Sequence, residues 1–114
     1  MIARLLGLRT ISPRALEARL GEVTVVDVNA PASWFAARVP GARSLDPDAF
    51  ATGDLPAAKD ATLVFYCSNP LCRKAPRAAK RALAMGYRDV LVLSAGIKGW
   101  KGAGFATESG GQGR

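Results

Sequence analysis

The sequence predicts an α/β fold with a mostly parallel central sheet. Short β-branched and apolar runs at 23–28, 62–66 and 90–93 are typical of buried strands, and segments with helical features stand between them. Strands that alternate with helices form right-handed crossover units, in which the strands run parallel and helices cover both faces of the sheet. The 114 residues, 49% of them hydrophobic, suffice for one compact domain and are too few for two.

The first helix is expected over residues 13–20. Ser12 is a favourable N-cap residue, Pro13 suits the first helical position, and Gly21 is well placed to end the helix. Almost every side chain of the following run at 23–28 is β-branched. This run is therefore predicted to be a strand that is buried on both faces.

The middle of the chain is predicted to be more irregular. Residues 31–37 are expected to form a short helix that places Trp34 and Phe35 in the core. A turn and a short strand at 43–45 follow, and residues 46–59 are expected to form a loop with one helical turn.

The second half is predicted to contain the most regular elements. The strand at 62–66 leads through a polar loop to an alanine-rich helix at 76–85, for which Gly86 is the expected C-cap. After the strand at 90–93, residues 95–100 are predicted to turn into a short last helix.

Composition limits what the chain is expected to do. The net charge of +7 arises from cations spread along the sequence, so we expect a solvated basic surface or an anion-attracting site rather than nucleic-acid binding. No apolar run approaches about 18 residues, and the short apolar N-terminus makes no convincing signal peptide, so a cytoplasmic protein without a membrane span is expected. We expect a monomer with a single domain over 1–107 and a flexible, glycine-rich tail over 108–114.

The chain has no histidine and two cysteines. Catalysis by Ser-His-Asp or Cys-His groups is therefore excluded, and so are the usual zinc sites. Cys67 and Cys72 make a poor zinc pair without further ligands, so we expect neither a metal nor a cofactor. Any thiol chemistry has to be activated by a helix dipole and by cations.

Cys67 is the strongest candidate for a catalytic residue. It directly follows the strand at 62–66 and faces the start of the helix at 76–85, where N–H groups and the helix dipole lower a thiol pKa and attract an anion. Ligands of parallel sheets bind at the carboxyl ends of strands. The position predicts thiolate chemistry on a small anionic substrate, whereas the alternative is a buried structural thiol.

The segment after Cys67 is predicted to form the substrate-binding or anion-binding loop. Its members are Ser68, Asn69, Pro70, Leu71, Cys72, Arg73 and Lys74. Either Arg73 or Lys74, or both, is expected to hold an oxyanion and to stabilise the thiolate, unless the side chains point to solvent. Ser68, Asn69 and Pro70 are expected to shape the loop.

Two residues outside the loop are predicted to support the site. Asp27 ends a buried strand and is expected to accept hydrogen bonds from loop amides rather than to act as an acid. Arg38 is expected at the rim of the site.

Three stretches of the chain resemble the rhodanese-like (sulfurtransferase) domain, and they follow one another along the sequence as they do in that family. Residues 26–29 with 38–42 are similar to the family's D-V-R … G-H-I-P-G-A signature, and residues 93–100 are similar to its closing L-x-G-G-x-x-x-W signature. Between them, the strand, Cys67, the loop and the helix are arranged as in its active-site loop. The resemblance spans roughly residues 10–105 and implies a three-layer α/β/α fold.

The resemblance also implies an activity. In this family the cysteine thiolate attacks a sulfane-sulfur donor such as thiosulfate, and the resulting persulfide passes its sulfur to cyanide, to a thiol or to a sulfur-accepting protein. The chain departs from the family at Asn29, Ser33, Arg38 and Ala95, where the family often has Arg, Glu, His and Gly. Its loop is similar to that of a subset with the pattern C-x-N-P-x-C-x-K-S.

Several alternatives stay open at this point. Cys72 is either a resolving thiol that attacks a persulfide or sulfenate on Cys67, or inert packing, or the nucleophile itself, with Arg77 at C-x4-R spacing. The altered family positions allow a non-catalytic binding or regulatory module. The C-x5-R spacing from Cys67 to Arg73 allows a phosphatase or arsenate reductase, although no Ser or Thr follows the arginine.

Overall fold

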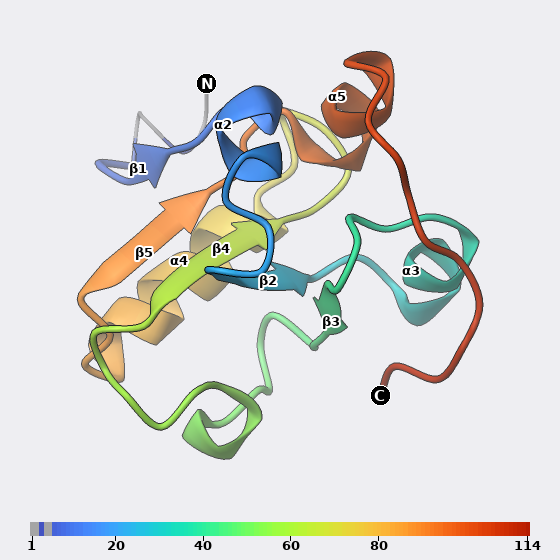
Figure 1. Cartoon of the computed structure of the whole chain (residues 1–114). Helices are drawn as coiled ribbons and strands as arrows, with labels where there is room; N and C mark the ends of the chain where they lie inside the picture. Colours follow the sequence, from blue (N-terminus) through green and yellow to red (C-terminus); the bar gives the residue numbers. More distant parts are fainter. Residues whose placement is uncertain (1–2, 4–5) are drawn as a thin grey trace.

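The computed structural model describes residue 3 and residues 6–114, and within them a single parallel sheet forms the centre of the chain (Figure 1). The strand order is β1-β5-β4-β2-β3, and every neighbouring pair is parallel. The strands are β1 (Arg9–Thr10), β2 (Thr24–Asp27), β3 (Arg43–Ser44), β4 (Thr62–Tyr66) and β5 (Asp89–Val92). The α/β class and the parallel sheet that the sequence predicts are confirmed.

Helices cover both faces of this sheet (Figure 1). They are α2 (Pro13–Glu17), α3 (Pro31–Ala36), the 3-10 turn η1 (Thr52–Asp54), α4 (Lys74–Ala84) and α5 (Gly96–Gly102). No helix in the described part of the chain is long and apolar enough to cross a membrane.

The side chains of β4 alternate between two apolar cores. Leu63, Phe65 and the following Cys67 pack in the core that contains the buried alanines of α4. Val64 and Tyr66 point to the opposite core, which contains Leu16 of α2 and Trp100 of α5. This alternation follows from the two-residue period of a strand, and it makes β4 the middle of a three-layer sandwich.

The element boundaries differ modestly from expectation. Helix α2 ends at Glu17, before the expected end at residue 20, while Gly21 takes the positive φ of 91° that was expected of a residue just past the helix. Helix α4 begins at Lys74 rather than at residue 76, because Pro76 fits within the first turn, where no N–H partner is needed. Strand β1 was not expected, since its two residues are too few to show a pattern.

One core prediction is wrong. Trp34 is 7% exposed and donates its indole N–H to the Ala42 carbonyl, but the neighbouring Phe35 is 54% exposed. Because α3 is a short helix at the surface, only one of two consecutive aromatic side chains can face the sheet.

The glycine-rich segment at 108–114 runs along α3 (Figure 1). The backbone groups of Arg38 and Glu108 pair with each other in an antiparallel bridge, with both N–O distances at 2.9 Å. The Arg38 guanidinium donates to the Gly110 carbonyl at 2.8 Å, and Arg114 donates to the Asn29 carbonyl at 2.5 Å. The sequence contained no apolar anchor for this segment, and its contacts here are polar.

Candidate active site

Cys67 lies at the carboxyl edge of the sheet, directly after β4. Cys67 is 3% exposed and packs in the core beneath α4. The loop of residues 68–73 leads from it to the first turn of α4. The structure therefore places the predicted nucleophile between a strand end and a helix start, as the sequence indicated.

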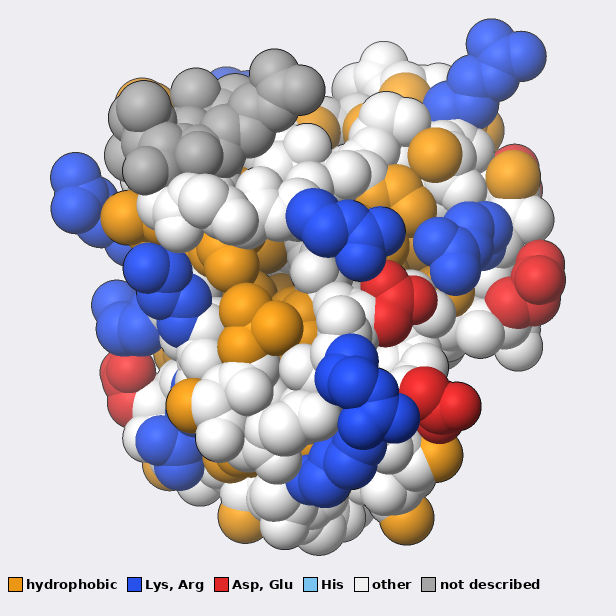
Figure 2. Space-filling model, turned by 90° about the vertical axis from the view of Figure 1, so that its left-hand side faces the viewer, with side chains coloured by type: hydrophobic (Ala, Val, Ile, Leu, Met, Phe, Trp, Pro, Cys, Tyr) orange, Lys and Arg blue, Asp and Glu red, His pale blue; other side chains and the backbone are white. Residues whose placement is uncertain are grey.

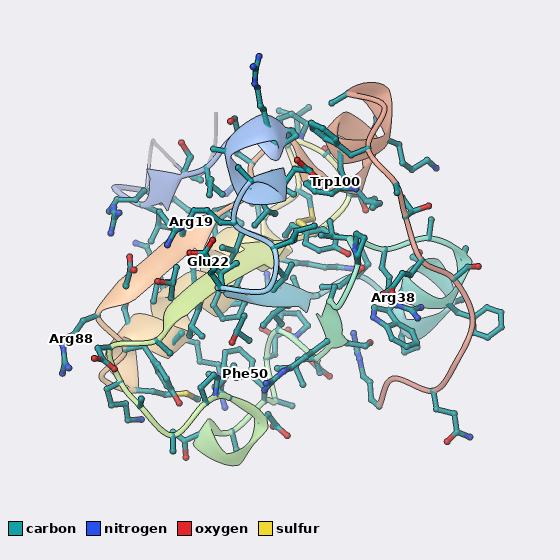
Figure 3. All side chains as sticks on the ribbon, viewed as in Figure 1. Arg19, Glu22, Arg38, Phe50, Arg88 and Trp100 are labelled. Atoms are coloured by element: carbon teal, nitrogen blue, oxygen red, sulfur yellow. A yellow bond between two sulfur atoms is a disulfide. The ribbon has the colours of Figure 1, made fainter. Side chains whose placement is uncertain are left out.

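Cys72 is joined to Cys67 by a disulfide (Figure 3). Their Cα atoms are 6.4 Å apart, within the range of about 4.4 to 6.8 Å that a disulfide spans. The sequence left this pairing open, because a separation of five residues is bridged only if the loop folds back on itself.

Asn69 explains how the loop folds back. Its carbonyl accepts the Cys72 N–H at 3.1 Å, and its side-chain Oδ1 accepts the Leu71 N–H at 2.9 Å. The first bond closes a β-turn over Asn69-Pro70-Leu71-Cys72, and the second is the local bond that asparagine makes at the start of such turns. Pro70 takes the second position of the turn, where the φ that its ring imposes is the one that the turn requires.

The N-terminus of α5 holds the beginning of the loop. The N–H of Ile97 donates to the Cys67 carbonyl at 2.9 Å, and that of Lys98 donates to the Ser68 carbonyl at 3.0 Å. Gly96 has a positive φ of 67°, and a Cβ there would lie 2.5 to 2.6 Å from backbone atoms of Ser68 and Asn69. Only glycine therefore allows this close approach.

Asp27 is completely buried and acts as an acceptor. Its carboxylate accepts the Tyr66 hydroxyl at 2.7 Å and the Asn29 N–H at 2.8 Å. Asn29 in turn accepts the Ser68 hydroxyl at 2.8 Å, so the end of β2 is linked to the site loop. Burial raises the pKa of Asp27 above its ordinary value, although the hydrogen bonds from Tyr66 and Asn29 oppose the shift.

Tyr66 is the residue that sequence reasoning missed. Its hydroxyl also accepts the Val39 N–H at 3.1 Å, and burial together with the Asp27 carboxylate raises its pKa. The available signal was a tyrosine at the end of an otherwise apolar strand, since a buried tyrosine hydroxyl needs a partner.

The cations near the site occupy different environments. Arg73 and Lys74 are exposed at the start of α4, whereas Arg77 is paired with Asp48 through two bonds of 2.6 and 3.0 Å. Arg38 is mostly buried, with its guanidinium 3.8 Å from the ring centre of Trp34. The structure thus links Asp27 to the site loop through Asn29, and it places Arg38 against α3 and the C-terminal segment.

A narrow pocket adjoins both cysteines, and its volume of about 10 Å³ gives room for about one water molecule. Its lining is completed by Ala3, two residues of the site loop (Asn69, Pro70), two of the first turn of α4 (Ala75, Pro76) and residues 92–94 at the end of β5 and just beyond it. On the face shown in Figure 2, Lys and Arg side chains are scattered among apolar and acidic ones rather than gathered in one patch. Within residue 3 and residues 6–114, no group of three or more His, Cys, Asp or Glu side chains could hold a metal ion.

A parallel α/β domain with a cysteine loop between its central strand and a helix is the class of structure that these observations define. The family model for the rhodanese-like domain matches residues 12–103, and the chain belongs to this family. The predicted family is therefore confirmed. The loop subset with the pattern C-x-N-P-x-C stays a prediction.

The chain is similar to one curated protein and to several solved structures. The chain is 33% identical over 90 residues to the HTH-type transcriptional regulator Rv0324 of Mycobacterium tuberculosis, a match that covers 79% of this chain and 39% of that protein. Among solved structures, the BH2092 protein of Bacillus halodurans has a TM-score of 0.79 at 21% identity, covering 89% of this chain and 77% of its own. A thiosulfate sulfurtransferase of Pseudomonas aeruginosa has a TM-score of 0.78 at 28% identity, covering 90% of this chain and 20% of its own.

Proposed function

We propose that this domain is a sulfurtransferase that carries sulfane sulfur on Cys67. The observation that carries the proposal is the position of Cys67, at the carboxyl end of β4 and directly before the loop that leads into α4. The similarity to a thiosulfate sulfurtransferase supports the same activity. Thiosulfate is the simplest donor, because Arg73 and Lys74 lie exposed where that loop enters α4 and can attract a small dianion.

The reaction begins from the reduced cysteine pair, so a thiol reductant must first supply two electrons to the disulfide. The Cys67 thiolate then attacks the outer sulfur of thiosulfate, the sulfur–sulfur bond of the donor breaks, and sulfite leaves with the electron pair. The product is a persulfide on Cys67. An acceptor such as cyanide, a thiol or a sulfur-accepting protein takes the outer sulfur and releases the Cys67 thiolate.

A regulatory module is the second candidate, and two observations favour it. Cys67 is 3% exposed and bonded to Cys72, so the site as it stands offers no free thiol. In addition, the chain spans 39% of the length of its curated relative, which is a transcriptional regulator. In this proposal the domain reports the state of the cysteine pair to a larger protein.

The test uses the Cys72→Ser variant, which leaves Cys67 as the single thiol. The reduced variant is treated with thiosulfate without oxygen, and its mass and the released sulfite are measured. The proposal predicts a gain of one sulfur atom on Cys67 and one equivalent of sulfite, both abolished by the additional change Cys67→Ser. No adduct with any sulfane donor would favour the regulatory module, and hydrolysis of a phosphate ester without sulfur transfer would favour a phosphatase.

A further inference from the structure

We propose that Cys72 resolves the Cys67 persulfide, so that the domain releases sulfide and finishes each cycle as the Cys67–Cys72 disulfide. This inference rests on the proposed sulfurtransferase function and names its first sulfur acceptor. It starts from the observation that the two sulfur atoms are already bonded to each other.

The loop is built to bring these two residues together. The β-turn that Asn69 and Pro70 start reverses the chain, and the Asn69 carbonyl holds the Cys72 backbone at 3.1 Å. The beginning of the loop is held independently, because α5 donates to the carbonyls of Cys67 and Ser68. A thiol tethered in this way reaches its target at a far higher effective concentration than a thiol in solution.

The same turn leaves fewer hydrogen-bond donors for the outer sulfur of a Cys67 persulfide. The N–H groups of Leu71 and Cys72 donate to Asn69, so these two amides are not turned toward the Cys67 sulfur. Backbone amides aimed at an anion stabilise it, and loop amides engaged elsewhere do not. The persulfide is therefore better placed to react onward with Cys72 than to be stored.

The position of Cys72 also determines which sulfur atom it attacks. External acceptors attack the outer sulfur, whereas Cys72 is held in bonding contact with the Sγ atom of Cys67, which is the inner sulfur. The Cys72 thiolate forms a bond to that atom, the bond between inner and outer sulfur breaks, and the outer sulfur leaves with the electron pair as hydrosulfide. Hydrosulfide is a better leaving group than a cysteine thiolate because its conjugate acid is the stronger acid.

Electrons balance in this step without a further oxidant. The sulfane sulfur is reduced to sulfide while the two cysteines are oxidised to a disulfide. An external dithiol then reduces the disulfide and restores both thiols. Over a full cycle, thiosulfate and a dithiol give sulfite, sulfide and an oxidised dithiol.

The test follows thiosulfate-treated, fully reduced protein by mass and by released sulfide, without oxygen. The wild type is expected to lose two hydrogen atoms and to release one equivalent of sulfide. The Cys72→Ser variant is expected to keep one extra sulfur atom and to release no sulfide. A wild-type persulfide as long-lived as that of the variant would overturn the inference and leave the proposed function intact. No persulfide on the variant would refute the proposed function itself.

A second variant probes the turn while keeping both thiols. Asn69→Ala removes the side-chain acceptor for Leu71, and the rate of sulfide release is expected to fall by about two- to tenfold, the equivalent of one hydrogen bond. Gln112→Ala removes an exposed side-chain amide elsewhere and is expected to leave the rate unchanged. Equal rates for both variants would contradict the role of the turn.

Discussion

The hydroxyl of Tyr66 donates a 2.7 Å hydrogen bond to the carboxylate of Asp27, across the central strands β4 and β2. Both residues are completely buried, and Tyr66 directly precedes Cys67. The pair therefore ties together the end of β4, which leads into the site loop, and the end of β2, which leads to Asn29. A buried carboxylate is tolerated only with such donors, so its role here is to hold the backbone around Cys67 in place.

Removal of this hydroxyl is predicted to destabilise the fold. Tyr66→Phe takes a donor from Asp27 and an acceptor from the Val39 N–H, and it should lower the free energy of unfolding by about 2 to 4 kcal/mol. Denaturant unfolding measures the loss. Tyr87→Phe is the matched control, because its hydroxyl makes a single bond to the Pro56 carbonyl and its loss should be about 1 kcal/mol. Equal losses would argue against the anchoring role of the Tyr66–Asp27 pair.

The raised pKa of Asp27 predicts a specific dependence of stability on pH. The folded protein binds the Asp27 proton more tightly than the unfolded chain, whose pKa is near the ordinary value of 3.8. As pH rises from 3.8 to the pKa of Asp27 in the folded protein, the unfolded state loses this proton first, so the free energy of unfolding decreases across that range. Above the folded pKa, the destabilisation caused by Asp27 stays constant.

Asp27→Asn removes the titrating group and provides the comparison. The unfolding free energy of the wild type minus that of the variant should fall between pH 3.8 and the folded pKa and then level off. Unfolding curves over acidic to neutral pH measure this difference. A difference that rises with pH would mean that the pKa is lowered in the fold.

Gly96 is predicted to be essential for the geometry of the site loop. Gly96→Ala places a Cβ against the Ser68 and Asn69 backbone and adds a side chain at positive φ, so it should destabilise the fold by more than about 2 kcal/mol and lower sulfur transfer. Gly102→Ala, in the same helix, meets nothing within 4 Å and should be neutral or stabilising. Thermal unfolding and the persulfide yield are measured for both variants. Equal stability and equal yield would mean that the loop moves aside to accept the new side chain at position 96.

The two exposed cations at the start of α4 are predicted to strengthen the binding of the sulfur donor. Replacing Arg73 and Lys74 together by Ala should raise the KM for thiosulfate about tenfold and should change the reaction with an uncharged persulfide donor much less. Arg77→Ala is the control, since that guanidinium is already paired with Asp48. The same increase in KM for both variants would show that net charge, rather than these two residues, governs binding.

The sequence predicted the parts of this structure that depend on local pattern. The run at 62–66 coincides with β4, so Cys67 was expected at a strand end, where the structure has it. Gly86, expected as the C-cap of the helix before it, has a positive φ of 99°. In each case the signal lies within a few residues, namely strand periodicity for the first and the left-handed backbone that glycine favours for the second.

Features that depend on distant partners, or on the hydrogen bonds within an irregular loop, could not be predicted. The partner of Tyr66 is 39 residues away along the chain, and nothing near either residue identifies the other. The pairing of Cys67 with Cys72 depends on the turn at Asn69, whose geometry follows from its hydrogen bonds rather than from the spacing of the cysteines. The hydrogen bond from Arg38 to the Gly110 carbonyl likewise depends on the path of the C-terminal segment, which lies 72 residues further along the chain.

Sulfur transfer by Cys67 is tested first by its alkylation rate with iodoacetamide as a function of pH, in the reduced Cys72→Ser protein with and without thiosulfate. For a working sulfurtransferase site we expect a thiolate that titrates well below the value of about 8.5 for an ordinary cysteine, and we expect thiosulfate to block alkylation as it adds one sulfur atom. A normal or raised pKa with neither protection nor adduct would contradict this expectation, and would mean that the domain keeps its fold for binding rather than for sulfur transfer.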